Sequence, residues 1–169
     1  FPQSGNAKPR IFRLLEDQAL VNHLGFNNEG VQKMAEKLDP NIQINSFKKY
    51  YKINKSPDKH KNISSGMLGI NIGKNGETSL EKAREDYVSA ISALHPFADY
   101  FTINISSPNT ENLHKLQEKQ LLNELLGSVC FLRDKLDKNS IKQTALLLKL
   151  SPDLDDKGLQ NCIGVIKEF

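Results

Sequence analysis

Three short, continuous apolar runs constrain the fold of this chain more than any other feature of its sequence. They cover residues 67–72, 101–105 and 145–150, and they do not alternate apolar with polar positions as a half-exposed strand would. Continuous runs of this length are typical of strands that are covered on both faces, as the strands of parallel sheets are. The sequence therefore predicts three strands, each buried on both faces.

A stretch with helical periodicity follows each of these runs. The apolar residues of the first stretch recur at helical spacing: Leu80, Ala83, Tyr87, Ile91 and Leu94. The stretches after the second and third runs show the same kind of periodicity. Because connections of this length allow crossovers, we expect three parallel, right-handed strand–helix units. The prediction is an α/β fold, and periodicity alone leaves both a barrel and a doubly wound sheet open.

Length, charge and cysteine content narrow the classes of protein to consider. The 169 residues can bury a core but fall short of the roughly 250 of a closed eightfold α/β barrel, which indicates part of a barrel. The net charge of +3 is too small to require a nucleic-acid partner, and we expect none. Cys130 and Cys162 lack metal-ligand spacing, so we expect no metal site and two reduced, packed thiols.

Other segments lie outside the three strand–helix units. Residues 10–13 and 19–22 flank a polar turn, which predicts a short hairpin or an extended excursion of the chain. Asn28 is a candidate cap for a helix that ends near Leu38. Residues 39–62 are rich in Lys, Asn and Ser without a sustained period, which predicts a surface insertion. Its lysines could contact anionic lipid or nucleic acid, but a solvated loop is the simpler interpretation.

Polar residues stand in or just after each apolar run, where an α/β barrel carries its chemistry. These residues are Asn71, Asn104, Ser107, Asn109 and Lys149. The carboxyl ends of neighbouring parallel strands meet at one edge of a sheet, so we expect these side chains to lie together. A buried amide left without hydrogen bonds costs about 1 to 3 kcal/mol. Two buried asparagines and a buried lysine therefore predict a site for a polar ligand.

Lys149 stands between two leucines, so its ammonium needs an anion, a carbonyl or a pKa shift that leaves it neutral. The residues leave three interpretations open. Lys149 pairs with a carboxylate elsewhere in the fold, it stabilises a developing negative charge, or its amine forms a Schiff base.

Residues 22–27 form a weaker candidate site. Gly25 permits a tight backbone path, and the flanking amides could orient a planar ligand. An ordinary polar turn explains the same residues.

Five motifs occur in order along nearly the whole chain, at residues 5–13, 22–27, 69–75, 104–110 and 149–154. Together they resemble the membrane-associated, quinone-dependent class of dihydroorotate dehydrogenases. The resemblance implies that residues 1–169 are part of an FMN-binding TIM (β/α)8 barrel, about its third to fifth strand–helix units, with the surface insertion at 39–62. It also implies a longer functional protein, because this part alone leaves barrel edges unpaired and is expected to be inactive.

The resemblance implies a role for each candidate residue. Ser107 matches the catalytic base that removes the proton from C5 of dihydroorotate while hydride passes from C6 to N5 of FMN. Asn71, Asn104 and Lys149 match residues that contact FMN. Arg13 matches a residue near the quinone site, and residues 108–116 match a mobile lid. The matches to substrate-binding residues are Asn22, His23, Leu24, Gly25, Phe26, Asn104 and Asn109.

The activity that the resemblance implies is oxidation of dihydroorotate to orotate in de novo pyrimidine (UMP) biosynthesis, with ubiquinone reoxidising the FMN. Segments outside this chain would attach the protein, expected to be a monomer, to the mitochondrial inner membrane or, alternatively, the bacterial cytoplasmic membrane. Two other functions stay open. One is a Schiff-base aldolase or lyase that uses Lys149, and the other is a non-catalytic fragment that binds an acidic partner or membrane surface through its lysines.

Overall fold

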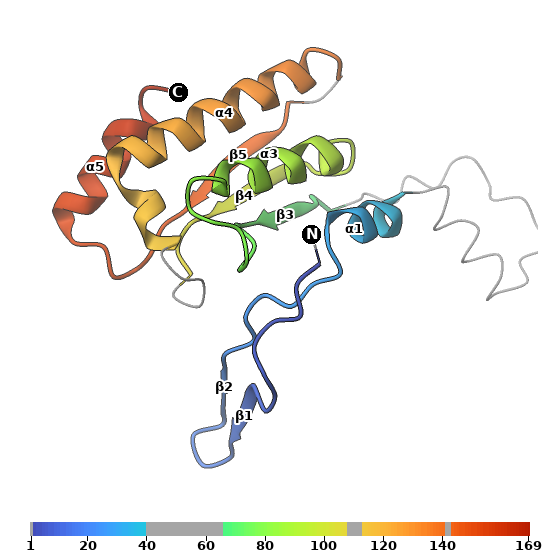
Figure 1. Ribbon diagram of the computed structural model, residues 1–169, viewed down its shortest axis with the longest axis vertical. Helices are drawn as coiled ribbons and strands as arrows, with labels where there is room; N and C mark the ends of the chain where they lie inside the picture. The colour runs from blue at the N-terminus through green and yellow to red at the C-terminus, as the bar shows by residue number, and fades with distance from the viewer. Residues whose placement is uncertain (1, 40–65, 108–112, 141–142) are drawn as a thin grey trace, which may run out of the picture.

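A three-stranded parallel sheet forms the centre of the molecule. The computed structural model of the chain describes residues 2–39, 66–107, 113–140 and 143–169. The sheet has the order β3 (Gly69–Ile72), β4 (Tyr100–Asn104), β5 (Ala145–Lys149), as Figure 1 shows. β-Branched and aromatic residues favour extended structure in β3 and β4. The three predicted strands and their parallel arrangement are confirmed.

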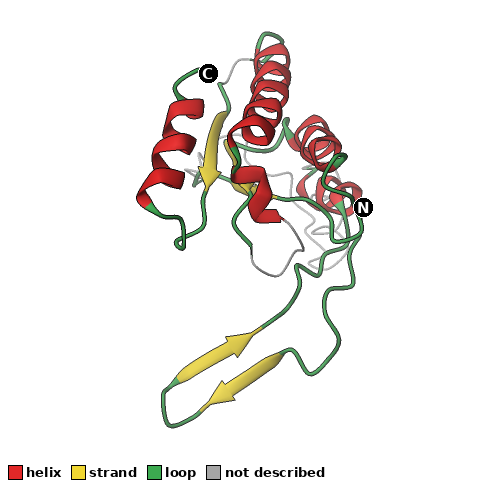
Figure 2. Ribbon diagram, turned by 60° about the vertical axis from the view of Figure 1, so that its left-hand side comes forward, coloured by secondary structure: helices red, strands yellow, loops and turns green. Residues whose placement is uncertain are grey.

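A helix follows each strand, and the three helices cover one face of the sheet (Figures 1 and 2). They are α3 (Ala83–Leu94), α4 (Lys119–Asp137) and α5 (Asp156–Ile166). Between them and the sheet lies the hydrophobic core, in which Ile72 and Phe101 from the strands join Tyr87 and Val129 from the helices. Full burial of one such apolar side chain contributes about 1.5 to 3 kcal/mol, so this layer holds the helices to the sheet.

The opposite face of the sheet is largely uncovered by the described residues. Side chains alternate between the two faces along a strand, and Asn71 on β3 and Leu147 and Lys149 on β5 are exposed. Leu147 is 51% exposed although it belongs to a continuous apolar run. The prediction that the strands are buried on both faces is wrong for β3 and β5, because the helices lie on the same side of the sheet. It holds for the central strand β4, which has no exposed residue.

The N-terminal part of the chain forms the predicted hairpin, which projects away from the sheet and its helices (Figure 2). β1 (Ile11–Leu14) pairs antiparallel with β2 (Ala19–Asn22), and each of their residues is exposed. Large apolar side chains, among them Phe12 and Leu20, therefore face solvent in this chain.

Helix α1 (Val31–Leu38) follows the hairpin and contacts α3. It ends at Leu38 as predicted, but its N-cap is Gly30 and not Asn28. The Asn28 Oδ1 atom accepts a hydrogen bond from the Gly30 N–H at 2.8 Å, and therefore shapes the turn before the helix instead of its first turn. The predicted insertion at 39–62 lies, apart from Asp39, outside the described residues.

Both cysteines are free thiols packed among other residues, as predicted. Cys162 on α5 is fully buried, and its Sγ donates to the backbone oxygen of Gln117 at 3.6 Å. Cys130 on α4 is half-buried. Burial raises the pKa of both thiols, which keeps them protonated and unreactive.

A buried hydrogen-bonded cluster joins α3 and α4 to the start of β5. His95, directly after α3, places its Nε2 atom 2.6 Å from Oδ1 of Asp137, the last residue of α4. The other oxygen of Asp137 accepts a hydrogen bond from the Thr144 N–H at 3.0 Å. Burial by itself raises the pKa of Asp137, but the hydrogen bonds from Thr144 and His95 outweigh it and hold the pKa below its ordinary value of 3.8.

Replacing Asp137 with Asn tests this cluster in the full-length protein. D137N is expected to lower the free energy of unfolding by about 1 to 3 kcal/mol near neutral pH, because one of the two accepting oxygens becomes an NH2 group, which cannot accept. Since the pKa of Asp137 is lowered in the folded state, its contribution is present above pH 3.8 and is lost as the pH falls through the lowered value. Urea unfolding as a function of pH measures both effects.

Asp134→Asn is the matched control. Asp134 lies on the same helix, is exposed, and pairs with Arg133 at the surface. Its replacement is expected to change the free energy of unfolding by less than about 1 kcal/mol. Equal losses in the two variants would contradict the role given to Asp137.

Candidate active site

The polar strand ends meet at the carboxyl edge of the sheet, as predicted. Asn104 is the last residue of β4 and Lys149 the last of β5, and the register of the two strands places them side by side. Within β4, Phe101 and Ile103 belong to the hydrophobic core beneath the helices. Because side chains alternate along a strand, Asn104 projects from the opposite face. That edge is where α/β barrels carry their catalytic residues.

Ser106 joins these two side chains in a continuous chain of hydrogen bonds. The Lys149 ammonium donates to the Ser106 Oγ atom at 2.7 Å, and that hydroxyl donates to Asn104 Oδ1 at 2.9 Å. The backbone N–H of Ser106 donates to the same Asn104 oxygen at 3.1 Å. Asn104 is 5% exposed and Ser106 6% exposed, so both are shielded from competing water.

The backbone beneath Asn104 is anchored to a helix. The buried hydroxyl of Tyr87 on α3 donates to the Asn104 carbonyl oxygen at 2.9 Å. Burial raises the pKa of Tyr87, so this hydroxyl stays protonated and remains a donor. The contact fixes the end of β4, from which the polar residues project.

Two of the predicted site residues are more exposed than expected. We predicted Asn71 and Lys149 to be buried, but both lie on the uncovered face of the sheet. Within the described chain, the Lys149 ammonium bonds the Ser106 hydroxyl instead of a carboxylate. Its charge is therefore held in place without being neutralised.

Ser107, the predicted catalytic base, is 6% exposed and directly follows Ser106. Asn109 and the rest of residues 108–112 lie outside the described residues. The second half of the predicted lid is packed: the 3-10 helix η1 (Leu113–Gln117) buries Leu113 and Leu116. These two leucines belong to the hydrophobic core, and the mobile lid at residues 108–116 stays a prediction.

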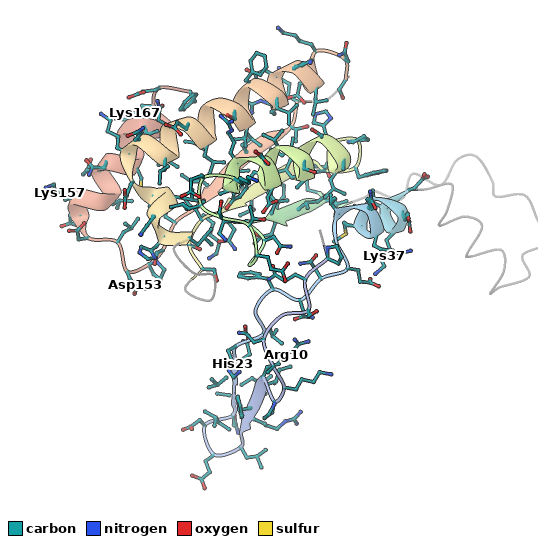
Figure 3. The ribbon with its side chains drawn as sticks, viewed as in Figure 1. Arg10, His23, Lys37, Asp153, Lys157 and Lys167 are labelled. Carbon is teal, nitrogen blue, oxygen red and sulfur yellow. The ribbon has the colours of Figure 1, made fainter. Side chains whose placement is uncertain are left out.

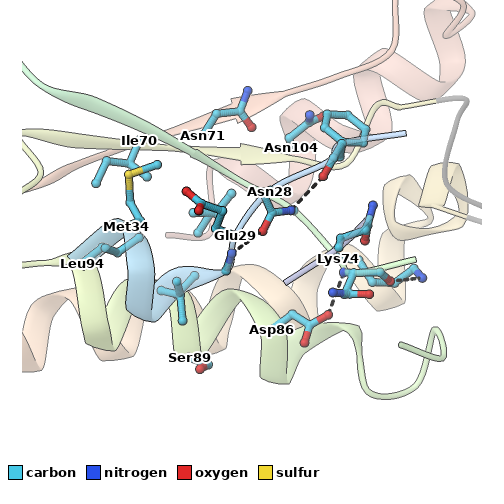
Figure 4. A pocket seen from close by; sticks show the side chains of 18 of the residues that line it. Asn28, Glu29, Met34, Ile70, Asn71, Lys74, Asp86, Ser89, Leu94 and Asn104 are labelled. Carbon is cyan, nitrogen blue, oxygen red and sulfur yellow. Dashed lines mark hydrogen bonds between the residues drawn. The ribbon is translucent and has the colours of Figure 1, made fainter. Parts of the chain in front are cut away.

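A cavity of about 310 Å³ opens between α1, β3 and α3, and Figure 4 shows it from close by. Three of the predicted site residues line it: Phe26, Asn71 and Asn104. Among its charged residues, Asp86 accepts a hydrogen bond from the Asn75 N–H at 2.8 Å. The cavity therefore brings Phe26, which follows Gly25, together with Asn71 and Asn104 from the strands.

Residues 22–27 cross the first residues of the chain at the base of the hairpin. Gln3 Nε2 donates to the Gly25 oxygen at 2.6 Å, and Asn6 Nδ2 donates to the His23 oxygen at 2.7 Å. Gly25 has a φ of 70°, and Phe26 has a φ of 53°. A positive φ in a phenylalanine costs of order 1 to 3 kcal/mol and is typical of functional sites.

The described structure does not unite every predicted site residue. Figure 3 shows His23 on the projecting part of the chain, together with Arg10. Arg13 is exposed there too and pairs with Leu20 across the hairpin. Among the described residues, Arg13, Asn22, His23, Leu24 and Gly25 lie outside both the cavity and the hydrogen bonds that join Lys149, Ser106 and Asn104. Ser107 directly follows Ser106 but does not line the cavity either.

Two residues of the site had no predicted role, Ser106 and Tyr87. For Ser106 a signal was present, because side chains two positions apart share a face of an extended chain and Asn104 lies two positions before it. For Tyr87 there was none, since its helical spacing predicts a core residue and does not reveal what its hydroxyl contacts.

Gly25→Ala is expected to disrupt the loop at residues 22–27. A Cβ atom there would lie 2.7 Å from the Asn6 backbone nitrogen, at a positive φ that alanine rarely adopts. We expect a loss of about 1 to 3 kcal/mol in the free energy of unfolding of the full-length protein. Gly164→Ala on α5 is the control, since its Cβ meets nothing within 4 Å and alanine favours a helix. An unchanged melting temperature in Gly25→Ala would contradict the assigned strain.

Comparisons with known proteins agree with this geometry. The family model for dihydroorotate dehydrogenase matches residues 1–169. The chain is 42% identical over 153 residues to the dihydroorotate dehydrogenase (quinone) of Albidiferax ferrireducens, covering 90% of this chain and 41% of that protein. It is 40% identical over 169 residues to the enzyme of the same name from Polynucleobacter necessarius, covering 99% and 44%.

Solved structures give the same result. The crystal structure of DHODH from Eimeria tenella in complex with ferulenol matches with a TM-score of 0.77 and 31% identity, over 99% of this chain and 45% of that one. The ligand-free form from the same organism matches with a TM-score of 0.75 and 32% identity, over the same shares of the two chains. The chain thus spans less than half the length of these relatives. It belongs to the dihydroorotate dehydrogenase family, and its strand–helix units form part of that family's TIM barrel.

Proposed function

We propose that this chain serves in the oxidation of dihydroorotate to orotate, with FMN as the bound cofactor and a quinone as the final electron acceptor. The observation that carries the proposal is the hydrogen-bonded set Lys149, Ser106 and Asn104, directly before Ser107, in a member of this family. The name of the relatives, dihydroorotate dehydrogenase (quinone), supports the choice of acceptor. The reaction belongs to pyrimidine biosynthesis.

The donors at the strand ends fit the cofactor. Asn104 Oδ1 already accepts two hydrogen bonds, so the group that Asn104 can present to a ligand is its NH2. Lys149 adds a positive charge and further N–H donors. The pyrimidine edge of a flavin carries acceptors that gain negative charge on reduction, which such donors stabilise. Asn71, Asn104 and Lys149 would therefore hold FMN, which supplies the hydride acceptor when bound.

Ser107 is proposed as the base that takes the C5 proton of dihydroorotate. A serine hydroxyl is a weak base, so its surroundings must carry the proton onward. Its burial supports this role, because a buried hydroxyl is shielded from competing water, which strengthens the electrostatic effects that act on it. Proton removal and hydride transfer then occur on the same substrate.

The remaining contacts of the proposed site follow from family membership. Phe26 lines the cavity with Asn104 and is proposed to pack against the substrate. Asn22, His23, Leu24, Gly25 and Asn109 stay predictions for substrate binding. Arg13 stays a prediction for the quinone site, and its position among exposed apolar residues such as Phe12 suits an apolar quinone.

Membrane association is proposed for the whole protein. None of the described helices is long and apolar enough to span a membrane. The curated relatives named here are bacterial, which supports the bacterial cytoplasmic membrane and gives no support to the mitochondrial inner membrane that we expected first. The monomeric state stays a prediction.

The proposal is tested by adding L-dihydroorotate anaerobically to the purified full-length protein and following its visible flavin absorbance. Bleaching supports both bound FMN and hydride transfer. A colourless sample, or a flavin that the substrate does not reduce, contradicts the proposal.

Ser107→Ala is expected to lower the rate constant of flavin reduction by about 10²- to 10⁴-fold, since proton transfer loses its base. Stopped-flow absorbance measures the rate constant. Ser92→Ala is the control, because the exposed Ser92 hydroxyl donates a hydrogen bond to the Val88 backbone oxygen within α3. A Ser107→Ala protein that reduces its flavin at the rate of the control would remove Ser107 from the mechanism.

Lys149→Met is expected to weaken FMN binding about ten- to hundredfold, the usual effect of losing a hydrogen bond from a charged donor. Lys149→Arg should retain part of the affinity, because it keeps the charge. Fluorescence titration of the apoprotein with FMN measures both.

The two alternative functions predict different results. A Schiff-base enzyme would form an adduct with a carbonyl substrate that borohydride traps, and both Lys149 variants would lose this adduct. Binding of an acidic partner that weakens with salt, without flavin reduction, would favour the basic binding fragment.

A further inference from the structure

Ser106 has no role in the reaction proposed above, yet it makes three of the hydrogen bonds that hold the site together. Its hydroxyl accepts from the Lys149 ammonium at 2.7 Å and donates to Asn104 Oδ1 at 2.9 Å. Its backbone N–H donates to the same oxygen at 3.1 Å. We propose that Ser106 is a positioning residue that orients Lys149 and Asn104 toward FMN, an inference that rests on the proposed function.

The first consequence is the orientation of the Asn104 amide. An N–H group can only donate, so the Asn104 atom that faces the Ser106 backbone must be the oxygen. The Ser106 hydroxyl then occupies the second lone pair of that oxygen. Asn104 is left to offer N–H donors to a ligand and cannot flip to offer an acceptor.

The second consequence concerns the charge of Lys149. A carboxylate in place of Ser106 would fix the ammonium but would also neutralise it. A hydroxyl accepts one hydrogen bond from the ammonium and leaves its positive charge and other N–H groups available. Ser106 therefore holds a full positive charge at the end of β5, beside donors from Asn104.

The two consequences define the ligand edge that the site selects. Lys149 and Asn104 both present donors, so the facing edge of the ligand must carry acceptors and tolerate or gain negative charge. Since Ser106 is 6% exposed, water does not readily replace its hydroxyl in this network. The network needs the Ser106 hydroxyl, because it accepts a hydrogen bond from Lys149 while it donates one to Asn104.

The experiment compares Ser106→Ala, Ser106→Cys and the control Ser92→Ala in the full-length protein. Ser106→Ala removes the hydroxyl, whereas Ser106→Cys fills its space with a weak hydrogen-bonding group and so separates packing from hydrogen bonding. The FMN dissociation constant of each apoprotein is measured by fluorescence, and the rate constant of flavin reduction by stopped flow with saturating dihydroorotate.

Both Ser106 variants are expected to raise the FMN dissociation constant about tenfold or more and to slow flavin reduction, while Ser92→Ala matches the unmodified protein. Values unchanged in Ser106→Ala, or restored in Ser106→Cys, would overturn the proposal. If the unmodified protein binds no FMN, the proposed function fails instead, so the two failures are distinguishable.

A double-mutant cycle with Lys149→Met tests whether Ser106 acts through Lys149. If it does, the double variant raises the FMN dissociation constant by less than the two single variants predict together. Its fold-increase is expected to be at least about twofold smaller than the product of the two single fold-increases. Effects that multiply fully would show independent roles and overturn the assignment of Ser106 as a positioning residue for Lys149.

Discussion

The pairing of β4 with β5 is the constraint on which the site depends. Asn104 and Lys149 are register partners at the ends of these strands, so the sheet alone brings an amide and an ammonium side by side. A slip of one residue would turn either side chain toward the helices. The register is held because Phe101 and Ile103, which alternate with the polar positions, are buried beneath α3 and α4.

The hydrogen bonds around Asn104 act on this framework from two sides. Tyr87 reaches from α3 to the Asn104 backbone, while Ser106 holds its side chain and links it to Lys149. Neither contact neutralises the Lys149 charge. A covered hydrophobic face thus supports a polar edge whose donors are already oriented, which is the arrangement that electrostatic catalysis requires.

The sequence predicted much of this arrangement because its signals were local or periodic. The strands, the helices that follow them and the hairpin all depend on residue types at short spacing. Errors occurred where contacts beyond the segment decide the outcome. Asn71 and Lys149 were predicted to be buried, yet a continuous apolar run does not say which face another part of a protein covers. The sequence also did not show that Leu113 and Leu116, within the segment predicted to be a lid, are part of the core.

The sequence by itself determined the α/β class, the order of the strand–helix units and the polar residues at the strand ends, because hydrophobic periodicity and motif order are properties of the chain alone. Only the tertiary structure decided that Ser106 accepts a hydrogen bond from Lys149, and that Tyr87 anchors the backbone of Asn104. These contacts join residues 17 and 43 positions apart. Their partners are chosen by strand register and helix packing, for which no local pattern of residues carries the information.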